Sequence, residues 1–322
     1  MSWLVTGGAG YIGSHIVQEF RTAGIDPVVI DDLSSGHADF VPHDVPFVKG
    51  SILDTDVVQA TLSEHHCEGV VHVAGFKYAG VSVSRPLHTY DQNATGTVSV
   101  LRAMQLAGVH RYVFSSSASV YGTPATDEVT EETALHPESP YGETKLLGEW
   151  LNRDMAAVDD AWQGVNLRYF NVVGSGSDQL YDTSPHNLFP IVFNMLLEGG
   201  TPKINGDDYP TPDGTCVRDY VHVADLARSH VAAAQAMMAG KTLDTAYNLG
   251  SGTGSSVREI MDAIARVTDI DFSPEIAPRR PGDPARIVAR GEKAARDIDW
   301  KMRNNLDDMV GSAWRARQAH QG

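Results

Sequence analysis

A tyrosine and a lysine four positions apart are the residues of this sequence best suited to proton chemistry. Tyr141 and Lys145 follow Ser139-Pro140, a suitable helix start, so they share one helical face. An isolated tyrosine has a pKa of about 10 and is a poor base near neutral pH. A cation one turn away favours the phenolate, and lowering the pKa by about 3 units requires about 4 kcal/mol. Tyr141 is therefore a candidate general base.

A serine is expected beside this pair. Residues 111–114 predict a strand that ends in Ser115-Ser116-Ser117, where the hydroxyl of Ser117 can reach a substrate oxygen. The pattern Tyr-x-x-x-Lys is common by chance, and alone it indicates only a surface pair. Together with this serine and a glycine-rich turn near the start of the chain, it favours catalysis.

The glycine-rich turn follows the first predicted strand, residues 3–5. Gly7, Gly10 and Gly13 are spaced as G-x-x-G-x-x-G, and a helix is expected from Tyr11 to residue 23. Such a turn lets the backbone approach a pyrophosphate, and the helix N-terminus supplies N–H donors and a partial positive charge. Asp31 lies 18 positions after Gly13. This context predicts a dinucleotide-binding turn.

The acidic end of the second predicted strand, residues 27–30, selects the form of the dinucleotide. Asp31 can accept hydrogen bonds from a ribose diol, and Asp32 follows it. No lysine or arginine that would neutralise a 2′-phosphate occurs between residues 31 and 48. The sequence therefore predicts NAD as the cofactor rather than NADP. Its positive nicotinamide ring would add to the charge of Lys145 in favouring the phenolate of Tyr141.

Strands and helices alternate through the first half of the chain, which predicts the α/β class and a doubly wound parallel (Rossmann) sheet. Ligands of such sheets bind at the carboxyl ends of the strands. The unusual residue clusters all follow predicted strands: Gly7 to Gly13, Asp31, Ser51-Ile52, Ala74-Gly75, Ser115 to Ser117 and Tyr169 to Asn171. We therefore expect these clusters to line one site.

The sequence changes character after Asn171. Residues 174–185 and 205–214 are rich in Gly, Ser, Asp or Pro and are expected to form loops. Residues 217–222 then predict a strand and residues 223–239 a helix. We predict an NAD-binding Rossmann domain over residues 1–171, completed by residues 217–247. Residues 172–322 are expected to form a smaller mixed α/β C-terminal substrate domain.

The composition disfavours several partners. The 322 residues carry 41 acids and 25 bases, a net charge of −16, which disfavours nucleic acid and an anionic membrane. An Asp-rich, Lys-poor surface suits a salty cytoplasm, although a merely acidic surface is the simpler explanation. Cys67 and Cys216 lie in separate motifs, so neither a disulfide nor a metal site is expected. The absence of a long apolar run and of room for a signal peptide predicts a cytoplasmic protein.

With these motifs assembled, the sequence resembles the extended short-chain dehydrogenase/reductase family, and within it the UDP-glucose (or UDP-galactose) 4-epimerases. The related sugar-nucleotide 4,6-dehydratases have an Asp-Glu pair after the catalytic hydroxyl residue, whereas this chain has Ala118-Ser119. The resemblance covers nearly the whole chain, through Gly7 to Ser14, Ala74 to Lys77, Ser115 to Gly122, Ser139 to Lys145, Arg168 to Asn171, Asp207 to Asp219 and Pro278 to Asp283.

The resemblance implies a set of site residues. Those implied for NAD are Gly7, Gly10, Tyr11, Ile12, Gly13, Asp31, Asp32, Ser51, Ile52, Ala74, Gly75, Lys77, Asn93, Ser115, Tyr141, Lys145 and Phe170. Those implied for a UDP-hexose substrate are Ser117, Asn171, Asn187, Arg218, Arg280, Asp283 and Ile287. The guanidinium groups in the second set suit a diphosphate in charge and geometry.

The resemblance also implies a mechanism and an assembly. The phenolate of Tyr141 takes the proton of the sugar 4-hydroxyl while a hydride leaves C4 for NAD. The 4-keto sugar then turns over, and the hydride returns to its other face. UDP-glucose and UDP-galactose are the expected pair of substrates. A homodimer is expected, paired through the helices over residues 93–107 and 141–156.

Some positions depart from the family pattern. Ser51 replaces an acid that meets adenine, Val172-Val173 replaces Pro-Val, and residues 203–205 differ from the usual uracil-side segment. Ile287 stands where a large aromatic residue restricts relatives to plain hexoses, but it also suits a core strand. A 4-epimerase of a UDP-N-acetylhexosamine or a UDP-uronate is the alternative. A non-catalytic NAD-sensing module is disfavoured because Tyr141, Lys145 and Ser117 are all present.

Overall fold

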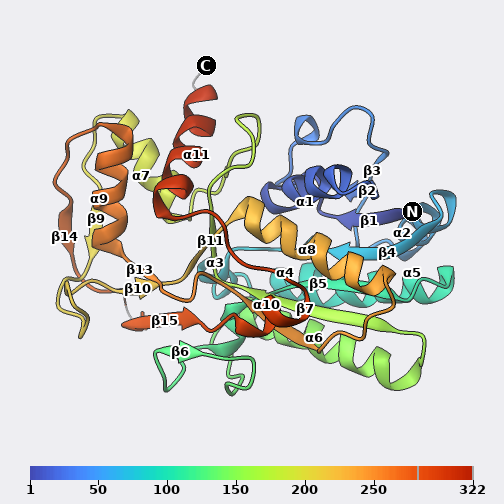
Figure 1. Cartoon of the computed structure of the whole chain (residues 1–322). Coiled ribbons are helices and arrows are strands. Elements are labelled where there is room, and N and C mark those ends of the chain that lie inside the picture. The colour runs from blue at the N-terminus through green and yellow to red at the C-terminus, as the bar shows by residue number, and fades with distance from the viewer. Residues whose placement is uncertain (281–282, 321–322) are drawn as a thin grey trace.

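A large parallel sheet with helices on both faces dominates the computed structural model, which describes residues 1–280 and 283–320 (Figure 1). Its strands run parallel throughout and give the strand order of a doubly wound fold. Across the sheet they are β12 (Ala246–Leu249), β7 (Gln163–Tyr169), β5 (Arg111–Ser117), β4 (Cys67–His72), β1 (Ser2–Thr6), β2 (Asp26–Asp31) and β3 (Phe47–Lys49).

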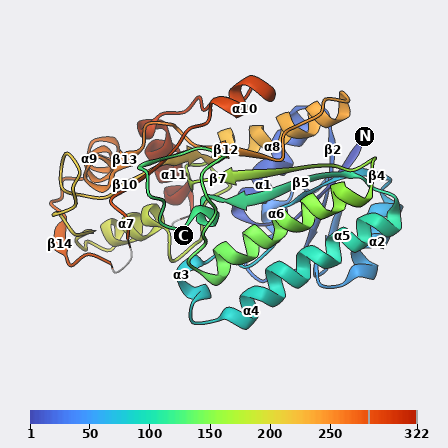
Figure 2. The same cartoon turned by 90° about the horizontal axis from the view of Figure 1, so that it is seen from below.

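Alternate strand residues pack against helices on opposite faces of this sheet. Val5 and Val71 belong to a core shared with α1 (Tyr11–Thr22) and α8 (Val223–Met238). Leu4 and Val70 belong to a second core, shared with α2 (Thr55–Glu64) and α5 (Gly96–Ala107). Helix α6 (Pro140–Val158) runs along the same face as α5 (Figure 2). Burial on both faces explains the apolar strands, and the predicted doubly wound sheet is confirmed.

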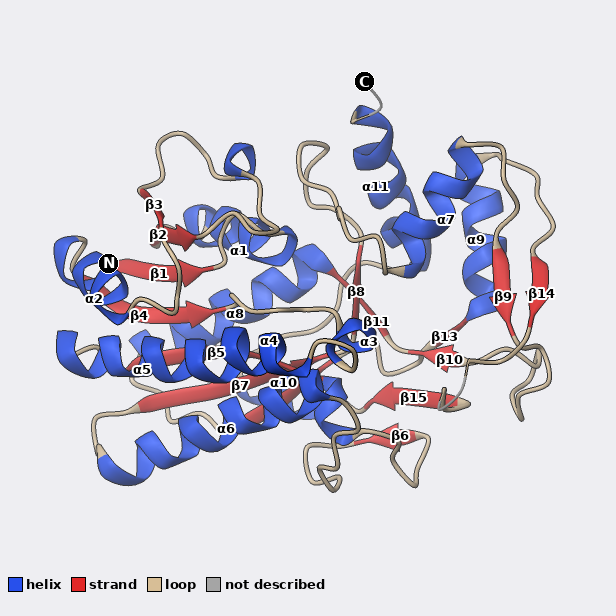
Figure 3. Cartoon of the chain, turned by 180° about the vertical axis from the view of Figure 1, so that it is seen from behind, coloured by secondary structure: helices blue, strands red, loops and turns tan. Residues whose placement is uncertain are grey.

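The remaining elements form a smaller mixed region beside the carboxyl ends of the strands (Figure 3). Helices α7 (Leu188–Leu197), α9 (Val257–Thr268) and α11 (Leu306–Ala319) share an apolar core that includes Phe193, Ile260 and Trp314. The strands of this region form one sheet and two parallel pairs. The sheet has the order β13 (Ser255–Ser256), β10 (Val217–Arg218), β15 (Arg286–Ala289) and β6 (Glu128–Val129); the pairs are β8 (Asn171–Val173) with β11 (Tyr220–His222) and β9 (Lys203–Asn205) with β14 (Glu275–Ala277).

The strand expected over residues 217–222 is in fact two strands in different sheets. Asp219 separates β10 from β11, and its buried carboxylate accepts hydrogen bonds from the backbone N–H groups of Ser251, Gly252 and Ala289. These bonds explain why the chain turns from one sheet to the other at this residue. After it, α8 and β12 return to the large sheet. The exact division into two domains stays a prediction.

Short elements surround the carboxyl ends of the large sheet. They are α3 (Ala79–Ser82), α4 (Pro86–Tyr90), a π-helical turn (Asp91–Thr95) that leads into α5, and 3₁₀ turns at Ala38–Phe40 and Ala118–Tyr121. Helix α10 (Glu292–Asp297) packs beside β12. None of the helices within residues 1–280 and 283–320 is both long and apolar enough to cross a membrane.

Candidate active site

The turn between β1 and α1 has room only for glycine at two of its positions. Gly7 has a φ of +71°, and a Cβ there would lie 2.8 Å from the backbone nitrogen of Ala74. A Cβ on Gly13 would lie 2.1 Å from the carbonyl oxygen of Gly7. Gly10 is the N-cap of α1 and offers no side-chain cap. The first N–H groups of α1 therefore stay open to an anion, which fits a dinucleotide pyrophosphate.

Asp31 lies at the end of β2, as the sequence predicts. One oxygen of its carboxylate accepts a hydrogen bond from Leu33 N at 2.8 Å and the other from Ala9 N at 3.0 Å. Burial raises the pKa of Asp31, while these two backbone hydrogen bonds lower it. A carboxylate has about four acceptor positions, so Asp31 can still accept from ribose hydroxyls. A 2′-phosphate would meet this carboxylate, which fits NAD and not NADP.

Tyr141 and Lys145 lie on α6, whose N-cap Ser139 accepts a hydrogen bond from Gly142 N at 3.2 Å. The Nζ atom of Lys145 donates a hydrogen bond to the Ser115 carbonyl oxygen at 2.8 Å. It lies 5.7 Å from the centre of the Tyr141 ring. Burial lowers the pKa of Lys145 to about 8, so the lysine is still mostly charged at neutral pH. The pair thus combines a buried phenol with a nearby cation.

The charge of Lys145 alone does not lower the pKa of Tyr141. Burial raises this pKa, and the Ser117 hydroxyl acts in the opposite direction. The phenol is withdrawn from water, which penalises the phenolate more than the neighbouring groups favour it. The phenolate therefore needs a further positive charge in the cleft. An oxidised nicotinamide ring carries such a charge.

The three consecutive serines at the end of β5 have three different tasks. Ser115 bonds to Nε2 of His230 at 2.9 Å through its hydroxyl, and to Lys145 through its backbone. Ser116 donates to the carboxylate of Glu149 at 2.5 Å. Ser117 lines the cleft, and its hydroxyl oxygen accepts from Ser119 N at 3.1 Å. Of the three serines, only Ser117 lines the cleft, where its hydroxyl donates to Oγ of Ser119 at 3.1 Å.

Asn93 holds together two parts of the site. Its Oδ1 accepts from Phe76 N at 2.6 Å, and its Nδ2 donates to Phe76 O and to Thr144 Oγ1, both at 3.0 Å. Asn93 thereby fixes the segment that carries Lys77 to the helix that carries Tyr141. It lies in the π-helical turn before α5, a kind of irregularity often found at functional sites.

These groups surround a cleft of about 1100 Å³ between the large sheet and the smaller region. This volume lies slightly above the usual range for small-molecule sites and suits two large ligands. Eighteen of the predicted residues line it: Gly7, Gly10, Tyr11, Ile12, Gly13, Asp31, Asp32, Ile52, Ala74, Gly75, Lys77, Ser117, Tyr141, Lys145, Phe170, Asn171, Asn187 and Arg280.

Six predicted residues are not among those that line this cleft: Ser51, Asn93, Ser115, Arg218, Asp283 and Ile287. Arg218 and Asp283 form an ion pair with each other. Ile287 lies opposite Arg218 in the register of β10 and β15 and packs beside the core that contains Val120 and Tyr121. Of the motif from Pro278 to Asp283, Pro281 and Gly282 lie outside the described residues.

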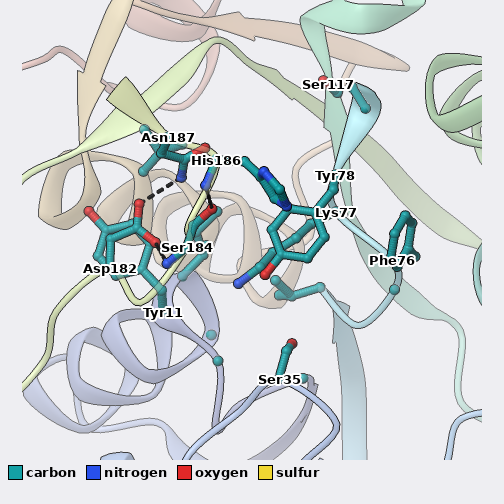
Figure 4. Close-up of a pocket in the computed structure, with 18 of the residues that line it drawn as sticks. Tyr11, Ser35, Phe76, Lys77, Tyr78, Ser117, Asp182, Ser184, His186 and Asn187 are labelled. Atoms are coloured by element: carbon teal, nitrogen blue, oxygen red, sulfur yellow. Dashed lines mark hydrogen bonds between the residues drawn. The ribbon is translucent and has the colours of Figure 1, made fainter. Parts of the chain in front are cut away.

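Several cleft residues are absent from the sequence-based set, notably Tyr78, Asp182, Ser184 and His186. In Figure 4, Asp182, Ser184 and Asn187 form one cluster, and Lys77 extends toward it from the loop that follows β4. Tyr169, the last residue of β7, lines the cleft as expected of the cluster from Tyr169 to Asn171. Asp182 belongs to a Gly/Ser/Asp-rich loop in which no local pattern distinguishes one acid from another.

Comparisons with known proteins agree with this geometry. The profile of the NAD dependent epimerase/dehydratase family matches residues 3–250. The UDP-glucose 4-epimerase of Bacillus subtilis is 41% identical over 98% of this chain and 96% of its own length. The UDP-glucose 4-epimerase of Lactobacillus helveticus is 42% identical over 99% of this chain and 98% of its own length.

Solved structures give the same result. A UDP-glucose 4-epimerase of Stenotrophomonas maltophila, with bound NAD and formylated UDP-arabinopyranose, is 38% identical. It superposes with a TM-score of 0.95 over 99% of this chain and 98% of that one. The enzyme of Bifidobacterium longum, in complex with NAD⁺ and UDP, is 36% identical and superposes with a TM-score of 0.90 over 99% of both chains. The expected family is confirmed: this chain belongs to the NAD dependent epimerase/dehydratase family.

Proposed function

We propose that this enzyme interconverts UDP-glucose and UDP-galactose by NAD-dependent epimerisation at C4 of the sugar. The observation that carries the proposal is the placement of Tyr141, Lys145 and Ser117 in the same cleft as the glycine-rich turn and Asp31. This arrangement brings a base, a cation and a hydroxyl next to a dinucleotide site. The UDP-glucose 4-epimerases that share about 40% of its residues support the choice of substrate.

The cofactor side of the cleft would hold NAD through backbone and side-chain groups. The N–H groups of α1 and the turn would hold the pyrophosphate, and Asp31 the adenosine ribose. Lys77 and Lys145 would contact the rest of the dinucleotide. The hydrogen bonds of Asn93 to Phe76 and of Lys145 to the Ser115 carbonyl would hold these lysines in place. When bound, NAD supplies a reversible hydride acceptor for C4.

Tyr141 would act as the base toward the sugar 4-hydroxyl. In the absence of a ligand, burial keeps its pKa high, so the phenol stays protonated. A positive ring beside it and the charge of Lys145 would favour the phenolate only in the assembled complex. Ser117 would hold the C4 oxygen by a hydrogen bond. The same tyrosine would return the proton when the sugar is reduced on its other face.

The substrate side would anchor the UDP portion while the sugar turns over. Arg280, Asn171 and Asn187 line the cleft and supply a cation and two amides. Arg218 forms an ion pair with Asp283, and a diphosphate that reached this pair would compete with Asp283 for the guanidinium of Arg218. An anchored diphosphate leaves the hexose free to present either face to the cofactor.

The assembly and location belong to this proposal as well. Helices α5 and α6 expose large apolar side chains: Val98 (36% exposed) and Leu106 (58%) on α5, and Trp150 (47%) and Val158 (77%) on α6. A homodimer paired through these helices would cover them. Both cysteines are buried and free, which suits the reducing cytoplasm. Sedimentation that finds only monomer at micromolar concentration would contradict the dimer.

A product analysis on a panel of UDP-sugars without added cofactor tests the proposed activity. Rapid exchange between UDP-glucose and UDP-galactose is expected. Preferred turnover of UDP-glucuronate or of a UDP-N-acetylhexosamine would assign the enzyme to one of the alternative 4-epimerases. No turnover of any UDP-sugar, with or without added NAD, would contradict the proposal.

A further inference from the structure

Asn187 occupies the N-cap position of α7 but does not cap the helix with its side chain. An N-cap asparagine usually accepts a hydrogen bond from the N–H of the second or third helical residue. The third helical residue of α7 is Pro190, which has no N–H. Asn305, at the same position of α11, caps in the usual way, its Oδ1 accepting from Asp308 N at 3.0 Å. The start of α7 therefore leaves the Asn187 amide available to another partner.

That partner is Asp182. Nδ2 of Asn187 donates to Oδ2 of Asp182 at 2.6 Å, while Oδ1 of Asp182 accepts from Ser184 N at 2.9 Å. The hydroxyl oxygen of Ser184 in turn accepts from His186 N at 3.2 Å. An ionised carboxylate can only accept hydrogen bonds, so Asp182 bonds to the NH₂ group of the Asn187 amide. This disfavours the orientation in which Oδ1 and Nδ2 of Asn187 are exchanged. Residues 182–187 are thus folded around one carboxylate (Figure 4).

The charge of Asp182 is unexpected in a cleft for two phosphate-bearing ligands. Burial raises the pKa of Asp182, whereas its hydrogen bonds and the charge of Lys77 lower it. The negative charge of Asp182 in turn raises the pKa of Lys77, which burial lowers. A carboxylate here repels a diphosphate, so its presence is best explained by the hydrogen bonds that it accepts from Asn187 and Ser184.

We propose that Asp182 is a positioning residue that fixes the Asn187 amide at the diphosphate end of the cleft. The inference rests on the proposed function, in which Asn187 contacts the UDP portion of the substrate. An amide that is already oriented loses less freedom when the ligand binds. The effect of Asp182 is therefore expected on UDP affinity and KM, and much less on kcat.

The discriminating variant is Asp182→Asn. The new amide oxygen can still accept from Ser184 N and keep the loop, but its NH₂ group opposes the NH₂ group of Asn187. Asp182→Ala serves as a second variant. UDP is titrated into the NAD-loaded protein, and its Kd is compared among wild type, Asp182→Asn, Asp182→Ala, Asn187→Ala and the double variant Asp182→Asn/Asn187→Ala, together with Tm.

Two residues provide matched controls. Asp178→Asn changes a neighbouring exposed acid whose contact with Arg315 is 3.9 Å long, and it should leave the UDP affinity unchanged. Asn305→Ala removes an asparagine that does cap its helix, and it should lower Tm without changing the UDP affinity. These variants separate a change in loop charge and a loss of helix stability from the proposed effect.

Asp182→Asn and Asn187→Ala are each expected to weaken UDP binding about 10-fold, and the double variant no further than Asn187→Ala alone, without a fall in Tm. If Asn187→Ala weakens binding but Asp182→Asn does not, or if the two effects add, the inference is wrong and the proposed function stands. A fall in Tm that accompanies the loss of affinity in both Asp182 variants would show that Asp182 has only a structural role, and it would also overturn the inference. If Asn187→Ala leaves the Kd of UDP unchanged, the substrate contact assigned to Asn187 itself fails.

Discussion

On the cofactor side of the cleft, backbone groups at the ends of β1, β2 and β4 form the wall, and two glycines leave no space for a side chain. On the substrate side, side chains on the loops and at the start of α7 form the wall, and hydrogen bonds within the loops orient them. The cofactor side is thus determined by local sequence, and its tolerance to substitution is small. The side chains of the substrate side can be substituted one at a time.

Substitution of the base should have the largest effect of all. Tyr141→Phe keeps the buried ring and removes only the hydroxyl, so we expect kcat to fall by at least about 100-fold in a folded protein. Lys145→Ala should lower kcat similarly, and it should also raise the apparent pKa in the pH dependence of kcat. Near-wild-type turnover by folded Tyr141→Phe protein would show that another group is the base.

On the cofactor side, Gly13→Ala should cause the next largest effect. Its Cβ would lie 2.1 Å from Gly7 O, so the turn must shift and lose its fit to a pyrophosphate. We expect purified protein with little bound NAD and a loss of about 1–3 kcal/mol in stability, measured by absorbance and by denaturant unfolding. Gly311→Ala on α11 is a suitable control, because its Cβ would make only ordinary contacts at 3.5 Å. Full NAD retention in Gly13→Ala would refute the assignment of this turn.

On the substrate side, Arg280→Ala should weaken binding and leave the chemistry largely intact. Loss of charge-assisted hydrogen bonds worth about 1.5–3 kcal/mol predicts a rise in KM for UDP-galactose of roughly 10- to 150-fold. The neighbouring Arg279 is the matched control, since it bonds to Asp208 and stacks on Tyr209 with its guanidinium 4.1 Å from the ring centre. Equal effects of Arg279→Ala and Arg280→Ala on KM would show that Arg280 has no specific role in substrate binding.

The smallest expected effect concerns the width of the sugar pocket. If Ile287 limits this width, the wild-type enzyme should prefer plain hexoses over N-acetylhexosamines by roughly 10- to 200-fold in kcat/KM. Ile287→Tyr should then abolish the N-acetyl activity and spare the plain hexoses. Ile287 is not among the residues that line the cleft, so any effect of this substitution on the sugar must pass through its neighbours. Equal efficiency of the wild type on both sugar classes, or an unchanged preference in Ile287→Tyr, would exclude it as the gate.

The same contrast explains what the sequence could predict. The glycine spacing, Asp31 and the alternation of strands and helices are local patterns, and they predicted the large sheet and most of its site. The break of the strand at Asp219 depends on backbone groups of Ser251, Gly252 and Ala289, which are distant in the sequence. The loop around Asp182 has no periodicity, and the balance of burial against charge at Tyr141 depends on the packed structure.

The central claim is that one cleft removes a hydride from C4 and returns it to the same carbon. UDP-galactose carrying deuterium at C4 can be incubated with the enzyme as purified, and the product examined by mass spectrometry and NMR. The account predicts UDP-glucose that retains the deuterium at C4, with none released to water. Product without the label, or label exchanged with the solvent, would contradict it.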